Sequence, residues 1–254
     1  MTQEPAQYTL PESQPTMAPL PRTLLPNLFS SLSRTTSGPS STPTRWTLLR
    51  TLKSENPNDI VGELRGSATF TPLRSSPTAS ISTPITADSK PDTTTSPDTE
   101  TDQELLYSEE GSLPASFGPG LRWTKKYIWH FPRDGNVSVW FVKVDKKQDA
   151  EEERDYLFHR FDFGVSPSAP GSGTDVVSGE EFVTPPTPPE VFGAAATKVI
   201  TARGNHLCIN DMYRTAYAFR VEEGSGEVVS WASRHVVRGP KKGQDIMNLY
   251  SREV

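Results

Sequence analysis

The four histidines and the single cysteine are the side chains of this 254-residue sequence best suited to catalysis or metal binding. His206 and Cys208 are two residues apart, so a β-strand would place the imidazole and the thiol on one face. A zinc site needs three or four ligands, and His159 and His235 would have to converge on the pair to supply them. The simpler interpretation is a structural pair inside a polar core, with a cysteine that packs as a small hydrophobic residue. We therefore predict no metal site, while Cys208 activated by His206 stays open as a nucleophile.

Glu109 and His159 are the candidate catalytic bases, and Tyr127 is the candidate acid. A carboxylate or imidazole held by tyrosines on neighbouring strands is the set of groups that small barrel lyases and isomerases use. The alternative for Glu109 is a salt bridge or a solvated position at a rim, as for most glutamates. An inward histidine such as His159 could also ligate haem iron, by analogy with nitrobindin-type barrels. The sequence leaves open whether the protein is an enzyme, and it identifies no cofactor.

A hairpin between residues 204 and 242 would position His206, Cys208 and His235. Residues 213–221 alternate Tyr, Thr, Tyr, Phe and Val with Arg and Ala, which is typical of a strand with one buried face. Residues 223–226 predict a turn, and residues 229–237 return with Val, Trp, Ser, His and Val on one face. Similar patterns predict strands at residues 46–50, 60–70, 104–113, 121–131, 137–144, 156–163 and 246–252, whereas residues 194–202 fit either a strand or a helical turn.

These elements predict an all-β fold, a single up-and-down antiparallel barrel of about 8–10 strands within residues 44–254. The links are short, with a hairpin signal at Asp134-Gly135, and no amphipathic helix is expected. Residues 1–43 are predicted to be a disordered leader, because Pro, Ser and Thr dominate them without a sustained period. The same composition predicts disordered insertions at residues 74–102 and 165–189.

The face of the sheet that would point into the barrel is aromatic and polar. Barrels filled only for stability usually carry Val, Ile and Leu inside, whereas a barrel that holds a ligand mixes aromatic side chains with a few polar groups. The pattern therefore predicts a small-molecule-binding barrel whose ligand is partly apolar or anionic, and a collapsed, purely structural interior is the alternative. The predicted ligand-binding residues are Tyr107, Glu109, Tyr127, Trp129, His159, His206, Cys208, Tyr217, Trp231 and His235.

Composition and charge argue against several other classes of protein. The net charge of −5 disfavours nucleic acid and anionic membranes as partners, since these usually select a basic face. No apolar run approaches the roughly 18 residues that span a bilayer, and one cysteine cannot form an internal disulfide. We expect a cytoplasmic location. Residues 14–53 contain Arg, Ser and Thr without an acidic residue, so a mitochondrial presequence is the alternative.

Several short segments occur along the chain in a recognisable order: SATF (67–70), LYSEEG (106–111), YIW (127–129), VWF (139–141), FH (158–159), HLCINDMY (206–213), GPKK (239–242) and YSR (250–252). Together they resemble a family called domain of unknown function 6314. The resemblance covers about residues 44–254 and skips both Pro/Ser/Thr insertions. The region of Trp46 also looks similar to the opening strand of calycin-like barrels such as lipocalins and fatty-acid-binding proteins. The resemblance implies a calycin-like barrel with an inward polar cluster, and it implies no reaction.

Overall fold

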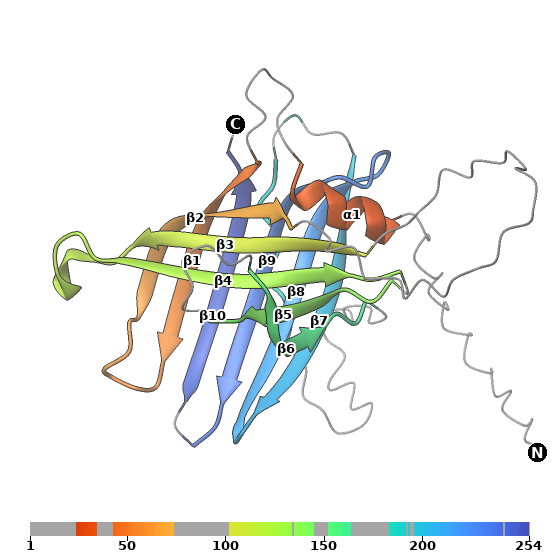
Figure 1. The fold of residues 1–254 in the computed structure, drawn as a ribbon. Coiled ribbons are helices and arrows are strands. Elements are labelled where there is room, and N and C mark those ends of the chain that lie inside the picture. The colour runs from red at the N-terminus through yellow and green to blue at the C-terminus, as the bar shows by residue number, and fades with distance from the viewer. Residues whose placement is uncertain are drawn as a thin grey trace, which may run out of the picture.

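The computed structural model describes residues 24–34, 43–73, 102–133, 135–144, 152–163, 183–191, 193, 196–240 and 242–253. Their regular secondary structure is nearly all β-strand, as predicted (Figure 1). The strands are β1 (Arg45–Ser54), β2 (Gly62–Pro72), β3 (Gln103–Ser112), β4 (Arg122–Phe131), β5 (Ser138–Val142), β6 (Arg154–Arg160), β7 (Thr197–Cys208), β8 (Asp211–Glu222), β9 (Val228–Arg238) and β10 (Gly243–Arg252). One α-helix, α1 (Leu24–Leu32), and one 3₁₀ helix (Ala115–Phe117) complete the described elements.

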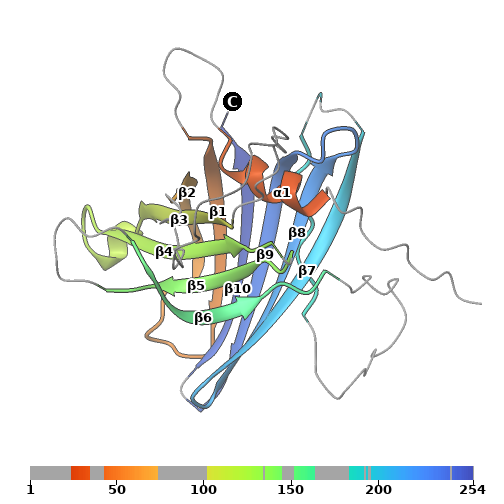
Figure 2. The same ribbon diagram turned by 45° about the vertical axis from the view of Figure 1, so that its right-hand side comes forward.

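All ten strands form one sheet in the order β6-β5-β4-β3-β2-β1-β10-β9-β8-β7. Strands that are neighbours in sequence pair antiparallel, except β6 and β7, which are the two edges. Strand β1 also pairs antiparallel with β10, from Trp46 opposite Arg252 to Ser54 opposite Gln244. The two edges meet after β6, where Asp162 forms an isolated antiparallel bridge with Arg203 of β7. In Figures 1 and 2 strands β3 to β6 cross in front of β10 to β7, so the sheet curls into a nearly closed barrel. The predicted up-and-down barrel is confirmed.

The alternation predicted for β8 and β9 correctly identifies the side chains that point into the barrel. Phe219 of β8 and Trp231 of β9 are opposite each other, and their side chains are almost completely buried. Tyr217 lies two residues before Phe219 and is equally buried. Residues 194–202, for which the sequence allowed two interpretations, include the beginning of strand β7.

Residues 183–191 have no helix or strand, but they dock on the outer face of β8 and β9. The Arg220 guanidinium donates hydrogen bonds to the carbonyl oxygens of Pro189 (3.1 Å) and Pro188 (3.2 Å), and the Ser230 hydroxyl also donates to Pro189. This part of the second insertion therefore has no helix or strand but makes specific contacts with the barrel. Residues 74–101 and 164–182, which make up the rest of the two predicted insertions, and Asp134 of the predicted turn lie outside the described residues.

Helix α1 contradicts the expectation that residues 1–43 have no regular structure and that the chain has no amphipathic helix. Its apolar side chains recur at helical spacing and are buried against one end of the barrel; they are Leu24, Leu28, Phe29 and Leu32. The Phe29 ring stacks on Phe131 at a centroid distance of 5.3 Å, and the Trp46 indole donates a hydrogen bond to the Leu32 carbonyl (3.3 Å). The helix forms because the barrel end supplies a partner for its apolar face, which the leader's composition does not reveal.

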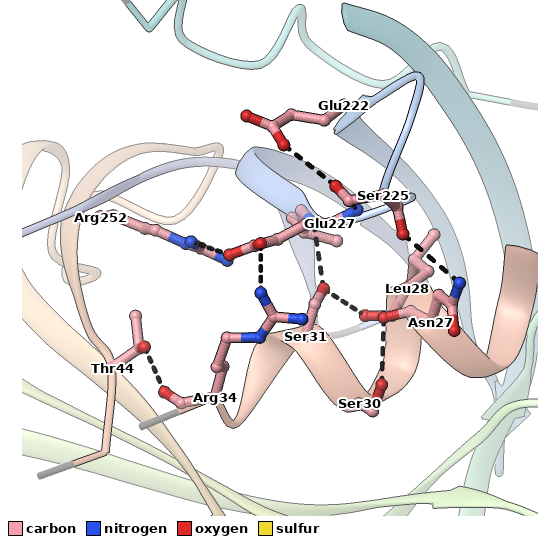
Figure 3. Close-up of polar contacts among 11 residues, drawn as sticks. Asn27, Leu28, Ser30, Ser31, Arg34, Thr44, Glu222, Ser225, Glu227 and Arg252 are labelled. Atoms are coloured by element: carbon pink, nitrogen blue, oxygen red, sulfur yellow. Dashed lines mark hydrogen bonds and ion pairs between the residues drawn. The ribbon is translucent and has the colours of Figure 1, made fainter. Parts of the chain in front are cut away.

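Polar contacts fasten α1 to the turn between β8 and β9 (Figure 3). The buried Ser31 hydroxyl accepts a hydrogen bond from the Val228 backbone N–H (3.0 Å) and donates to the Leu28 carbonyl (2.8 Å). Arg34 and Arg252 both form ion pairs with Glu227. The helix is therefore bound to the barrel through both its apolar face and its C-terminal end.

Replacing Ser31 with alanine should lower the free energy of unfolding by about 1–2 kcal/mol, because the Val228 N–H would lose its acceptor in a buried place. Ser30→Ala is the matched control, since Ser30 lies one residue away on the exposed side of α1 and should change stability by less than about 0.5 kcal/mol. Urea denaturation of both variants measures the difference. Equal effects would show that the hydrogen bond to Val228 contributes nothing.

Candidate ligand-binding site

The half of the barrel interior that lies away from α1 contains a cavity of about 240 Å³. The α1 end is filled by packed side chains such as Phe29, Trp46 and Phe131. The volume is just below the roughly 300–1,000 Å³ of pockets for drug-sized ligands, so the cavity suits a smaller molecule. Its lining residues are Arg50, Tyr107, Glu109, Lys125, Tyr127, Trp129, Val139, Phe141, Phe158, Tyr213, Tyr217, Trp231, Ser233, His235, Val237, Gln244, Ile246, Asn248 and Tyr250.

A buried ion pair between Arg50 of β1 and Glu109 of β3 forms the polar centre of this lining. The Arg50 Nη2 atom donates to both carboxylate oxygens of Glu109, at 2.7 and 2.9 Å, and the two side chains are only 6% and 2% exposed. The Tyr107 hydroxyl donates a further hydrogen bond to the same carboxylate and lies 2.8 Å from the Tyr250 hydroxyl. Buried charges are tolerated when they are paired and hydrogen-bonded in this way, so the pair is a rigid feature of the wall.

A chain of hydrogen bonds continues from Arg50 across the strands β10 and β9. The Arg50 Nε atom donates to the Asn248 side-chain oxygen (2.7 Å), and the Asn248 amide donates to the Ser233 hydroxyl (2.9 Å). The same hydroxyl lies 3.1 Å from Nε2 of His235. Arg50, Asn248 and Ser233 are opposite one another in the β1–β10–β9 register, so strand pairing alone aligns them.

Trp123 of β4 packs against the Arg50 side of the ion pair. The Arg50 guanidinium lies over the Trp123 ring at 4.7 Å from its centroid, a cation–π contact. The indole occupies space that is free because β3 and β2 carry glycines there. A Cβ atom at Gly111 of β3 would lie 2.6 Å from the ring, and one at Gly66 of β2 would lie 3.0 Å from it. The close approach of the indole at Gly66 and Gly111 therefore serves the Arg50 site.

Aromatic rings form the rest of the wall. The Tyr127 ring stacks against Phe158 at a centroid distance of 5.8 Å and contacts Phe141 at 5.6 Å. On the opposite side, Trp231 stacks in parallel on Tyr250 at 3.5 Å. The cavity thus combines an apolar, aromatic surface with one concentrated polar region around Arg50 and Glu109.

Burial lowers the pKa of His235 to about 3, with the positive charges of Lys125 and Arg50 acting in the same direction. Burial raises the pKa of Tyr127 to about 12, and the Glu109 charge adds to the effect. At neutral pH the imidazole is therefore uncharged and the Tyr127 phenol is protonated. The charged side chains of the lining are Arg50, Lys125 and Glu109, so the wall carries a net charge of +1.

The structure brings seven of the ten predicted ligand-binding residues to the cavity wall and places three elsewhere. The seven are Tyr107, Glu109, Tyr127, Trp129, Tyr217, Trp231 and His235. His159 is buried at the meeting of β6 and β7, where its Nε2 atom lies 3.0 Å from the Tyr217 hydroxyl and its ring packs on Gly204. His206 and Cys208 lie at the end of β7 and are only partly buried. These three side chains are not part of the lining.

Five of the polar lining residues were not among the predicted ones: Arg50, Lys125, Ser233, Asn248 and Tyr250. The β1 sequence does contain a signal for Arg50, which shares one face of the strand with the buried Trp46 and Leu48. A charged residue on the apolar face of a strand indicates a buried ion pair or a site. Asn248 carries no comparable signal, because its role depends on the pairing of β1 with β10.

Two other features of the described residues bear on the kind of protein. Within the ranges that the structure covers, no three His, Cys, Asp or Glu side chains come together in a way that could hold a metal ion. None of the helices in those ranges has the length and apolar character needed to cross a membrane.

Comparisons with known proteins test the resemblance noted in the sequence. A search of the curated proteins and a search of the solved structures each gave no match. A family model described as Family of unknown function (DUF6314) matches residues 43–176 and 181–252, which include all ten strands. The resemblance to this family is confirmed, and the chain belongs to the DUF6314 family.

Proposed function

We propose that this barrel is a small-molecule-binding module of the calycin-like type, which encloses one ligand in the cavity beside Arg50 and Glu109. The main observation behind the proposal is a cavity whose wall contains polar side chains already fixed by the Arg50–Glu109 ion pair. Protein interiors are normally close-packed, and a barrel that served only as a scaffold would fill this space with aliphatic side chains. Aromatic walls with a few fixed polar groups are typical of ligand pockets.

The contacts of the polar groups that line the cavity support binding over proton transfer. Both Glu109 oxygens accept hydrogen bonds, from Arg50 and Tyr107, and the hydrogen bonds of His235 lead to Ser233 instead of to the carboxylate. An imidazole with a pKa near 3 and a phenol with a pKa near 12 are poor acid–base groups at neutral pH. The haem alternative also lacks support, because the His159 Nε2 atom is engaged by Tyr217 and His159 does not line the cavity.

A cavity-filling substitution tests the proposal. Val139→Phe places a larger side chain on the cavity wall, and Val199→Phe makes the same change at an exposed position of β7 as the matched control. Titration calorimetry of the purified full chain with benzoate, benzamide and benzylammonium, together with native mass spectrometry for co-purified molecules, should detect binding to the wild type. Val139→Phe should abolish that binding and Val199→Phe should preserve it. Absence of any ligand or probe from the wild type, or equal binding by both variants, would refute the proposal.

A further inference from the structure

Around Arg50 and Glu109, the cavity wall leaves three hydrogen-bond donors available. Arg50 uses Nε and Nη2 in its bonds to Asn248 and Glu109, and no described residue accepts a hydrogen bond from its Nη1 atom. The Lys125 ammonium has no acceptor within the described ranges either, and the same holds for the Tyr127 hydroxyl. The Glu109 oxygens, by contrast, are already occupied by Arg50 and Tyr107. A ligand group that binds to this part of the wall must therefore bring acceptors.

The three donors also lie in a defined arrangement. Lys125 is the register partner of Glu109, and Tyr127 is the register partner of Tyr107, so both point to the same interior face as the ion pair. Lys125 is exposed and lines the cavity, which places it at the opening, whereas Trp129, two residues beyond Tyr127 on the same face, is buried. Along β4 the wall thus changes from cationic at the opening to aromatic inside.

The net charge of the wall and the volume of the cavity restrict the class of ligand further. The net charge of +1 from Arg50, Lys125 and Glu109 is neutralised by a single negative charge, whereas a dianion such as a phosphate monoester would leave one charge uncompensated. The cavity of about 240 Å³ limits the attached apolar body to one smaller than a drug-sized molecule. A carboxylate has one charge and two acceptor oxygens, which match an ammonium and a guanidinium or phenol donor.

We propose, building on the binding function above, that the ligand is a small monocarboxylate whose carboxylate is held by Lys125, Tyr127 and the free edge of Arg50. Its apolar body lies inward against the aromatic side chains of the wall, among them Phe141, Phe158 and Trp129. The Arg50–Glu109 pair stays intact on binding, because the ligand uses the donor that the pair leaves available.

The charge preference of the full-length protein tests this inference. Benzoate and hexanoate should each bind at least about tenfold more tightly than their neutral amides, and benzylammonium should bind more weakly still. Lys125→Met should weaken benzoate binding about tenfold and leave benzamide binding unchanged, whereas Lys125→Arg should retain the preference. Lys126→Met is the matched control, because Lys126 is the next residue, points to the other face of β4 and pairs with the exposed Glu152. Urea denaturation of each variant confirms that it folds.

The outcomes separate this inference from the proposed function. If benzamide or benzylammonium binds as well as benzoate, and Val139→Phe abolishes that binding, the protein is a binding module and the carboxylate assignment is wrong. The assignment is also wrong if Lys125→Met and Lys126→Met affect benzoate equally, or if neither carboxylate binds. If no probe of any charge binds and no molecule co-purifies, both proposals fail.

Discussion

The Glu109→Leu variant is expected to be less stable than the wild type by about 3–5 kcal/mol in free energy of unfolding. The substitution leaves the Arg50 guanidinium, whose side chain is 6% exposed, without its counter-ion in the barrel interior. It also removes the acceptor of the Tyr107 hydroxyl. A buried charge that loses its partner retains its desolvation cost, and this cost dominates the expected effect. Equilibrium urea denaturation provides the measurement.

The neighbouring residue supplies the control for this prediction. Glu110 forms an ion pair with Arg122 at 2.9 Å, but the two side chains are 43% and 60% exposed. Glu110→Leu should therefore cost less than about 1 kcal/mol. The double variant Arg50→Met/Glu109→Leu removes both buried charges and should recover most of the lost stability. A Glu109→Leu effect as small as that of Glu110→Leu would show that the Arg50 charge is solvated and that the pair is not a buried one.

Trp231→Ala should destabilise the fold by a similar amount, about 3–5 kcal/mol. The indole is buried and stacks on Tyr250. It also makes a T-shaped contact with Trp46 and a tilted contact with Phe70. Its loss would enlarge a cavity whose aromatic walls cannot close around the space. Trp140→Ala is the matched control, because Trp140 lies half-buried on β5 near the sheet edge. Its side chain buries less apolar surface than that of Trp231, so its loss should cost less stability. Equal decreases in the thermal unfolding temperature of the two variants would contradict the packing role of Trp231.

Strand periodicity was sufficient to predict the barrel and much of its inner face, because side-chain direction along one strand is a local property. The residues Tyr217, Trp231 and His235 were placed correctly on this ground alone. The same reasoning failed for His159. Pairing between β5 and β6 is irregular, and Phe158 lines the cavity whereas His159 does not.

The polar centre of the site could not be predicted from local pattern because it depends on contacts between distant strands. Arg50 and Glu109 are 59 residues apart, and Arg50 and Asn248 are 198 apart. Helix α1 escaped prediction for a related reason. Nine residues are too few for a stable isolated helix in water, so its existence depends on burial of Leu28 and Phe29 at the barrel end.

The pairing of β1 with β10 has a consequence for how the chain folds. These strands lie side by side near the middle of the sheet, yet Trp46 and Arg252 are separated by almost the whole described chain. During synthesis the half made of β1 to β6 emerges with β1 as an edge strand, and the β1 edge stays unpaired until the residues of β10 leave the ribosome. Contacts of such long sequence separation are slow to form, because the intervening chain must be ordered first. Nascent chains that stop before β10 would therefore expose two strand edges, β1 and β9, to aggregation or to capture by chaperones.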